Sequence, residues 1–266
     1  MQASAIVTYR GAPGTDRRAN LDAVLAWLAG MPAIETIVVE QETHPRLEAP
    51  LAHPAARVAF AYNAGPFNKA WGLNVGARHA AGGVLLFGDA DVIVPGGLTA
   101  AATHGAQSMQ VVKPYRQLID LTPEETRLVR EGGGEGPLSL DVSARRDRDA
   151  IGERLALCGG WFAMRHDAFV AIGGFDERFV GWGGEDDAMT MKVELARLST
   201  CELDPGPALH LWHPRSPEST TGHPDYRSNC ALLDDYARYD EVTLARLFEV
   251  QRQTYGRRDK YRPDPR

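Results

Sequence analysis

Three consecutive acidic residues, Glu185, Asp186 and Asp187, follow the glycine- and tryptophan-containing run Gly-Trp-Gly-Gly at 181–184. Adjacent carboxylates repel one another, so enclosing them would raise a pKa towards neutrality, where a general base works well. Glycine backbone approaches ligands closely, and an indole ring beside carboxylates is suited to hold a sugar. Acidic residues also favour the first turn of a helix, here expected over 188–198. Helix initiation leaves the Gly-Trp-Gly-Gly run unexplained, so we interpret the segment as a sugar-binding loop as well.

A second acidic pair, Asp89 and Asp91, directly follows the apolar run 84–87. In an open α/β sheet, ligands bind beyond the carboxyl ends of the strands, and oxygen ligands suit Mg²⁺ or Mn²⁺. An ion held there could offset the charge of a leaving diphosphate. The alternative is an ordinary solvated turn, in which aspartate is common.

His210 and His213 are three residues apart in the segment Leu-His-Leu-Trp-His. At this spacing both imidazoles can reach one side of a turn, and imidazole suits transition metals. One buried and one exposed histidine is the alternative for an isolated pair. Together with Asp89 and Asp91 the pair predicts a mixed oxygen and nitrogen metal site, which favours Mn²⁺ over Mg²⁺.

The surrounding pattern predicts an α/β fold with a mostly parallel sheet. We expect strands near 5–9, 34–40, 58–62, 84–87 and 110–115. Helices are expected over 21–28, where Asn20 would be the N-cap, over 68–81 and over 226–255. The stretch 121–150 is predicted to be a helical segment followed by a mobile loop, and 44–54 and 214–224 are predicted to be loops.

Composition narrows the class of protein. The 266 residues have a formal net charge of -6, which argues against a nucleic-acid binder. Three widely spaced cysteines indicate neither a disulfide framework nor a zinc motif, and they fit free thiols in the cytoplasm. Neither a signal peptide nor an apolar stretch of about 20 residues is apparent, so no intrinsic membrane segment is expected.

Several segments together resemble the β-1,4-galactosyltransferases and related bacterial chondroitin-polymerase-type transferases. These segments are Phe-Asn-Lys-Ala-Trp-Gly-Leu-Asn-Val-Gly at 67–76, Phe-Gly-Asp-Ala-Asp at 87–91, Gly-Gly-Phe-Asp at 173–176, the acidic loop at 181–187, and the histidine pair. Their order and spacing agree with that family from about residue 5 to 215. The resemblance implies a single GT-A domain over 1–255 with a Rossmann-like sheet. Its nucleotide-binding half would span 1–115, its acceptor and metal half 150–225 and its C-terminal helices 226–255, leaving 256–266 as a disordered tail.

The resemblance also implies roles for individual residues. Asp186 would be the base that deprotonates the acceptor hydroxyl, and Asp91, His210 and His213 would hold Mn²⁺, or Mg²⁺. The donor and acceptor sugars would lie against Trp182, Gly183, Gly184, Glu185, Asp187 and Gly160. The nucleotide would contact Tyr9, Arg10, Arg18, Glu40, Asn68, Lys69, Asn74 and Asp89. Arg17 is the alternative to Arg18, and Glu40 and Gln41 would face the uracil ring.

We therefore expect a metal-dependent, inverting transferase that moves a hexose or N-acetylhexosamine from a UDP-sugar to a saccharide or other hydroxyl acceptor. His210 replaces a methionine of the family motif, so a harder imidazole nitrogen would take the place of a soft thioether sulfur among the metal ligands. The membrane anchor and paired cysteines of the family are absent, and 121–150 has no clear counterpart. Two alternatives remain: a retaining GT-A transferase of the polypeptide N-acetylgalactosaminyl type, or an inactive nucleotide-sugar or glycan-binding protein.

Overall fold

The sheet at the centre of the protein is built around β1 and β4, which pair in parallel. In the computed structural model, which describes residues 2–12, 14–48, 50–132, 157 and 159–262, seven strands pair in the order β3-β2-β1-β4-β8-β6-β9, and three more in the order β5-β10-β7. The strands are β1 (Ala3–Tyr9), β2 (Ile34–Glu42), β3 (Arg57–Tyr62), β4 (Val84–Gly88), β5 (Val92–Ile93), β6 (Val111–Lys113), β7 (Leu118–Asp120), β8 (Phe162–Arg165), β9 (Thr200–Glu202) and β10 (Ala208–His210). The helices are α1 (Arg17–Ala29), α2 (Lys69–His79), α3 (Leu98–Gln107), α4 (Pro123–Glu131), α5 (His166–Ala171), α6 (Glu185–Leu195), α7 (Pro224–Tyr236) and α8 (Glu241–Thr254).

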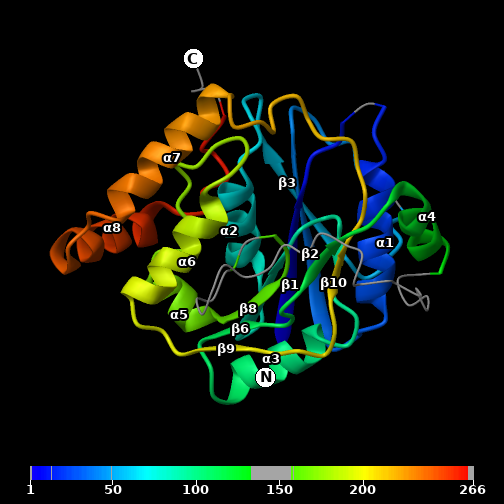
Figure 1. Cartoon of the computed structure of the whole chain (residues 1–266), viewed down its shortest axis with the longest axis horizontal. Helices are drawn as coiled ribbons and strands as arrows, with labels where there is room; N and C mark the ends of the chain where they lie inside the picture. Colours follow the sequence, from blue (N-terminus) through cyan, green and yellow to red (C-terminus); the bar gives the residue numbers. More distant parts are fainter. Residues whose placement is uncertain (1, 13, 49, 133–156, 158, 263–266) are drawn as a thin grey trace.

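Helices cover both faces of the large sheet (Figure 1). Alternate side chains of a strand point to opposite faces. In β1, Val7 therefore belongs to the cluster that includes buried residues of α1 and α4, while Ile6 belongs to the cluster on the other face, which includes buried residues of α2, α5, α6, α7 and α8. All seven residues of β1 are buried, as a strand covered on both faces requires. The predicted α/β class with a mixed, mostly parallel sheet is confirmed.

The chain changes direction beside β1. It runs outward through β1, β2 and β3, and then returns through α2 to β4 on the other side of β1. The carboxyl ends of β1 and β4 therefore flank a switch point, which is where α/β sheets bind ligands. Asp89 and Asp91 follow β4 at this point.

The predicted strands and helices are found, with three differences. The first helix begins at Arg17 rather than after Asn20, which instead is buried and donates to the Trp212 carbonyl oxygen at 3.1 Å. The stretch 121–150 contributes α4, and β7 just before it was not predicted; residues 133–150, assigned to a mobile loop, lie outside the described part. The C-terminal helical stretch is two helices, α7 and α8, because the chain turns between Tyr236 and Glu241.

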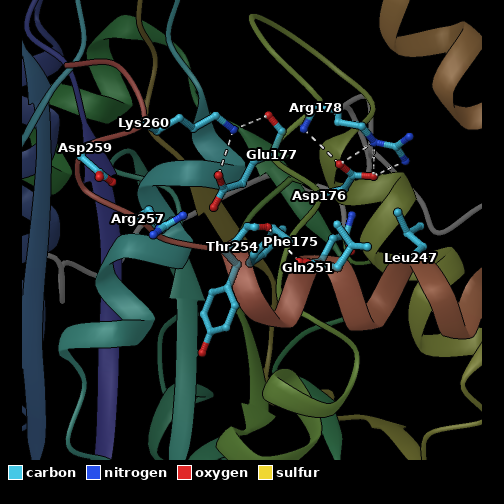
Figure 2. A pocket seen from close by; sticks show the side chains of 12 residues that line it. Phe175, Asp176, Glu177, Arg178, Leu247, Gln251, Thr254, Arg257, Asp259 and Lys260 are labelled. Atoms are coloured by element: carbon cyan, nitrogen blue, oxygen red, sulfur yellow. Dashed lines mark hydrogen bonds and ion pairs between the residues drawn. The ribbon is translucent and has the colours of Figure 1, made fainter. Parts of the chain in front are cut away.

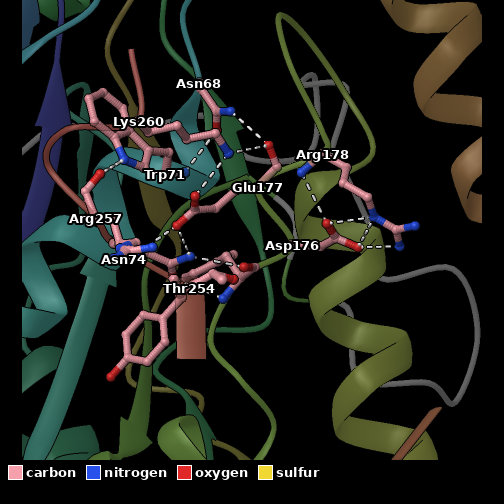
Figure 3. A network of polar contacts seen from close by, with 12 residues as sticks. Asn68, Trp71, Asn74, Asp176, Glu177, Arg178, Thr254, Arg257 and Lys260 are labelled. Carbon is pink, nitrogen blue, oxygen red and sulfur yellow. Dashed lines mark hydrogen bonds and ion pairs between the residues drawn. The ribbon is translucent and has the colours of Figure 1, made fainter. Parts of the chain in front are cut away.

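Residues 256–262 belong to the stretch 256–266 that the sequence predicts as a disordered tail, and they pack on the domain (Figure 3), whereas residues 263–266 lie outside the described part. The Trp71 Nε1–H donates to the Arg257 carbonyl oxygen at 2.8 Å, and Lys260 Nζ lies 2.9 Å from Glu177 Oε2. Tyr261 packs edge-on against the Trp71 ring, with centroids 4.9 Å apart. These contacts tie the segment to α2 and to the loop that precedes α6.

A pocket of about 590 Å³ lies between this segment, α8 and the loop before α6 (Figure 2). Its lining residues are Phe175, Asp176, Glu177, Arg178, Leu247, Val250, Gln251, Thr254, Tyr255, Arg257, Asp259 and Lys260. None of these is a site residue that the sequence predicts. Among the helices that the structure describes, none combines the length and apolar character needed to cross a membrane. Cys201 and Cys230 are free thiols, whereas Cys158 lies outside the described residues.

Candidate metal and carboxylate site

The small sheet brings the histidines to the Asp89–Asp91 turn. In β10, His210 pairs with Val92 of β5 on one side and with Asp120 of β7 on the other. The Leu211 N–H donates to the Asp91 carbonyl oxygen at 2.7 Å, which fixes the following residues against the turn. Backbone pairing thus places the side chains of Asp91, His210 and His213 together.

These three side chains form a group that could hold a metal ion, with ligand atoms within 4.8 Å of one another. His213 Nε2 lies 3.2 Å from Asp91 Oδ2, and His210 Nε2 lies 3.7 Å from Asp91 Oδ1. All three side chains are largely buried, being 17–23% exposed. The predicted set of ligands is therefore assembled around one point.

Each histidine is oriented through its other ring nitrogen. His210 Nδ1 lies 2.7 Å from Asp120 Oδ1, and His213 Nδ1 lies 3.0 Å from the Pro214 carbonyl oxygen. An acceptor at Nδ1 favours the tautomer that leaves Nε2 free to bind a metal. Asp120 was not predicted from the sequence, because only the pairing of β7 with β10 reveals it.

Electrostatics at Asp91 favour a charged carboxylate. Burial alone would raise its pKa, but the hydrogen bond from His213 and the charges of both imidazoles hold the pKa below its usual value. The same hydrogen bond raises the pKa of His213. The charge of Arg17 acts on both groups, whereas Arg18 forms an ion pair with Asp22 at 2.9 Å. Of the two arginines considered for a second basic contact, Arg17 is thus the one whose charge acts on the metal-ligand group.

Asp89 points to a different set of side chains from Asp91. Its Oδ1 lies 2.8 Å from Lys69 Nζ, which also lies 2.9 Å from Asp186 Oδ2 and 3.5 Å from Glu185 Oε1. We call Lys69, Asp89, Glu185 and Asp186 the carboxylate cluster. The Asp89–Asp91 turn therefore joins the cluster to the metal-ligand group.

Two of the three consecutive acids are enclosed. The side chains of Glu185 and Asp186 are 14% and 13% exposed, whereas Asp187 is exposed to solvent. Burial raises the pKa of Asp186, and it raises the pKa of Glu185 to about 7. The three acids also form the first turn of α6, as the helix-initiation interpretation expects, and the sugar-binding interpretation stays a prediction.

The glycines before α6 adopt backbone conformations that other residues rarely reach. Gly181, Gly183 and Gly184 have φ of 74°, 91° and 93°. Asn229 of α7 holds this loop, because its Nδ2 donates to the carbonyl oxygens of Val180 at 3.0 Å and Gly183 at 2.7 Å.

Trp182, in the same loop, is 42% exposed. It stacks on Tyr226, with ring centroids 5.2 Å apart and planes at 22°. One face of the indole is therefore occupied by the protein. Tyr226 and Asn229 were not predicted, because α7 follows the loop by some 40 residues of chain.

Three of the predicted nucleotide contacts are fully buried. Asn68 and Asn74 are 0% exposed, and Glu40 is 1% exposed. Asn68 caps α2, Asn74 bonds to the backbone of Phe175, and Glu40 accepts from two backbone N–H groups of the loop after β2. Their polar side-chain atoms are engaged within the protein, and their assignment as nucleotide ligands stays a prediction.

Arg10, Gln41 and Gly160 also have close protein neighbours. Arg10 donates to the carbonyl oxygens of Gln41 and Gly65, both at 2.8 Å, and Gln41 is 0% exposed. A Cβ at Gly160 would lie 2.4 Å from the Tyr115 hydroxyl oxygen. Tyr9, at the carboxyl end of β1, is 6% exposed, and burial raises its pKa.

Comparison with known proteins supports the motif resemblance. A family model described as the N-terminal domain of galactosyltransferase matches residues 152–214, which include the acidic loop and both histidines. Mouse β-1,4-galactosyltransferase 4 is 32% identical over 102 residues, which is 36% of this chain and 28% of that protein. The human protein is 39% identical over 83 residues, 30% of this chain and 23% of that protein. The chain therefore matches less than a third of the length of these relatives.

Solved structures share the fold. GalNAc-T7 with UDP, GalNAc and Mn²⁺ aligns with a TM-score of 0.57 at 15% identity, covering 94% of this chain and 55% of that one. The mannosyltransferase PcManGT from Pyrobaculum calidifontis, in complex with GDP-Man and Mn²⁺, aligns with a TM-score of 0.54 at 16% identity, covering 94% of this chain and 69% of that one. The predicted GT-A fold and the predicted resemblance to β-1,4-galactosyltransferases are confirmed. The similar sequences and the similar structures named above are all glycosyltransferases.

Proposed function

We propose that this protein is a metal-dependent inverting glycosyltransferase that transfers a hexose or N-acetylhexosamine from a UDP-sugar to an acceptor hydroxyl. One observation carries the proposal: a single turn after β4 joins a metal-ligand group, through Asp91, to a buried carboxylate cluster, through Asp89. Glycosyl transfer needs both parts, because a diphosphate must leave while a hydroxyl is deprotonated.

The metal-ligand group fits a divalent ion. One carboxylate and two imidazoles converge, and the Nδ1 atoms of both imidazoles already have acceptors. Such a donor set suits Mn²⁺, and Mg²⁺ less well because it prefers oxygen ligands. When bound, the ion would supply positive charge to the diphosphate of the donor. Arg17 would add a second positive charge beside it.

Asp186 acts as the base in this proposal. Its carboxylate accepts the proton of the acceptor hydroxyl while that oxygen forms a bond to the anomeric carbon of the donor sugar. The bond from the anomeric carbon to the diphosphate breaks in the same step, and UDP leaves. A single displacement of this kind inverts the anomeric configuration. A positioned base contributes a factor on the order of 10²–10⁴ to the rate.

Glu185 and the loop at 181–184 would hold the sugars. Glu185 lies next to the base on α6, and the exposed part of Trp182 offers an apolar surface to the C–H face of a sugar ring. Asp187, which faces solvent, would accept hydrogen bonds from hydroxyl groups of the acceptor.

Two measurements test this function. A thermal-shift panel of UDP-sugars with Mn²⁺ should show stabilisation that EDTA abolishes, because a ligand that binds only the folded state raises Tm. The anomeric configuration of the transferred sugar, read from proton NMR couplings, should be opposite to that of the donor. Retention would contradict the inverting mechanism and favour the N-acetylgalactosaminyl type of transferase. Binding without any release of UDP would favour an inactive binding protein.

A further inference from the structure

Lys69, the first residue of α2, has an environment that donor binding does not explain. Its side chain is only 14% exposed, and its ammonium group lies among three carboxylates, at 2.8 Å from Asp89, 2.9 Å from Asp186 and 3.5 Å from Glu185. An ammonium group has three N–H donors. The Lys69 ammonium donates to both oxygens of Asp186 and lies at hydrogen-bond distance from Asp89, and Glu185 lies at ion-pair distance.

The three carboxylates come from two separate parts of the chain. Asp89 lies in the turn after β4, and Glu185 and Asp186 begin α6. Asn68 fixes the position of Lys69, because it caps α2 by accepting from the Trp71 N–H and also donates to the carbonyl oxygen of Glu177 at 2.9 Å. Lys69 is thus the point at which α2, the β4 turn and α6 meet.

We propose that Lys69 is a positioning residue that keeps Asp186 ionised and correctly oriented as the base, and that it is not a ligand of the donor diphosphate. This inference rests on the proposed function of Asp186. It assigns to Lys69 a different role from the nucleotide contact expected from the sequence.

The balance of charge supports this role. Asp186 faces the carboxylates of Asp89 and Glu185, the Gly159 N–H at 3.4 Å and the ammonium of Lys69. Burial and the charge of Asp89 raise the pKa of Asp186, whereas the ammonium of Lys69 and the hydrogen bond from the Gly159 N–H lower it. Burial alone would lower the pKa of Lys69, but the surrounding carboxylates raise it well above its usual value, so the ammonium stays charged.

Binding of a diphosphate by Lys69 would require the ion pairs at 2.8 and 2.9 Å to break. That change would leave Asp186 buried beside two other carboxylates without a cation, and an uncompensated buried charge takes up a proton instead. A protonated Asp186 cannot accept the proton of the acceptor. The two roles of Lys69 are therefore incompatible in one catalytic cycle.

The experiment compares Lys69→Met, Lys69→Gln and Lys69→Arg in the full chain. The side-chain carboxyl resonances of ¹³C-labelled protein are titrated, and Asp186 is identified by the signal that disappears in Asp186→Asn. A cation within 4–6 Å typically lowers an aspartate pKa by about one to three units. The Asp186 midpoint should rise by at least about one unit in the Met and Gln variants and stay close to wild type in the Arg variant.

Lys260→Met is the matched control, because Lys260 pairs with Glu177 outside the cluster. It should leave the Asp186 midpoint unchanged. An Asp186 midpoint that does not move in Lys69→Gln or Lys69→Met would overturn the proposal. Lys69→Gln keeps a polar side chain of similar length, so it provides the result if the Met variant does not fold.

Kinetics supply the second readout. The acid limb of kcat/KM should move to higher pH in Lys69→Gln, with the KM of the UDP-sugar within about twofold of wild type, since donor contacts are retained. A large rise in KM together with an unchanged pH profile would show instead that Lys69 binds the donor. If the wild type transfers no sugar, the proposed function fails, and the carboxyl titration still decides whether Lys69 controls the ionisation of Asp186.

Discussion

Replacing Asp120 should weaken Mn²⁺ binding although Asp120 is not one of the three ligand residues. Its Oδ1 lies 2.7 Å from His210 Nδ1, while His210 Nε2 faces Asp91. The carboxylate fixes the orientation of the imidazole ring and makes its Nε2 atom a stronger ligand for a metal ion. Loss of such a partner typically costs 10–100-fold in metal affinity.

The exposure of Asp120 sets the expected size of the effect. Its side chain is 46% exposed, so solvent screens the interaction and the lower end of that range applies. Asp120→Asn keeps an acceptor oxygen and loses the charge, so we expect a loss of about threefold to tenfold, or about 0.7–1.4 kcal/mol. Asp120→Ala loses both and should reach about tenfold or slightly more.

Calorimetric titration of Mn²⁺ into the protein without nucleotide measures the effect directly. Asp167→Asn is the control, since Asp167 is also half exposed and forms an ion pair, with Arg165, outside the metal-ligand group. It should bind Mn²⁺ as the wild type does. Equal affinities for wild type and Asp120→Ala would refute the reasoning that Asp120 orients His210 for a metal.

Three further outcomes follow from the fold and the site. Because the pKa of Glu185 is about 7 when folded and its usual value is 4.5, the folded state binds more protons between these pH values, and the free energy of unfolding should fall by up to about 3 kcal/mol in total as pH rises from 4.5 to 7. Urea denaturation should show that Glu185→Gln removes this dependence on pH. Gly88→Ala should lose about 1–3 kcal/mol of stability, because a Cβ would lie 2.2 Å from the Trp161 ring, whereas Gly222→Ala, with open space around it, should be neutral. Deleting the residues after Tyr255 removes the packed C-terminal segment and should lower Tm by several degrees in a thermal unfolding scan. An unchanged Tm would count against a structural role for this segment.

The sequence predicted the fold and the grouping of Asp91, His210 and His213 because those signals are local. An apolar run followed directly by Asp89 and Asp91 defines a strand end, and the spacing of His210 and His213 lies within a few residues. Helix and strand periods depend on neighbours in the chain, so they can be read without coordinates.

Features that depend on pairing between distant segments could not be predicted in the same way. Asp120 meets His210 only through the register of β7 with β10, across 90 residues of chain. Lys69 meets Asp186 across 117 residues. Asn68 and Asn74 have the residue type of polar ligands in the sequence, but both are fully buried in the structure, and burial depends on the complete fold.

The C-terminal segment shows the same limit in another form. Its basic and proline-rich composition is typical of a disordered tail. One aromatic residue, Tyr261, and the backbone of Arg257 nevertheless find partners at Trp71. Tyr261 was the available signal in the sequence, but its partner could not be identified before the fold was known.

The most direct test of the central claim is UDP release from UDP-sugars by wild type and Asp186→Asn, each with Mn²⁺ and with EDTA, beside calorimetry of UDP binding in Mn²⁺. A saccharide mixture and water serve as acceptors. We expect UDP release that requires Mn²⁺ and falls by about 10²–10⁴-fold in the variant, while UDP binds both proteins equally. Release that continues in EDTA, or near-normal release by Asp186→Asn, would contradict a metal-dependent transferase in which Asp186 is the base.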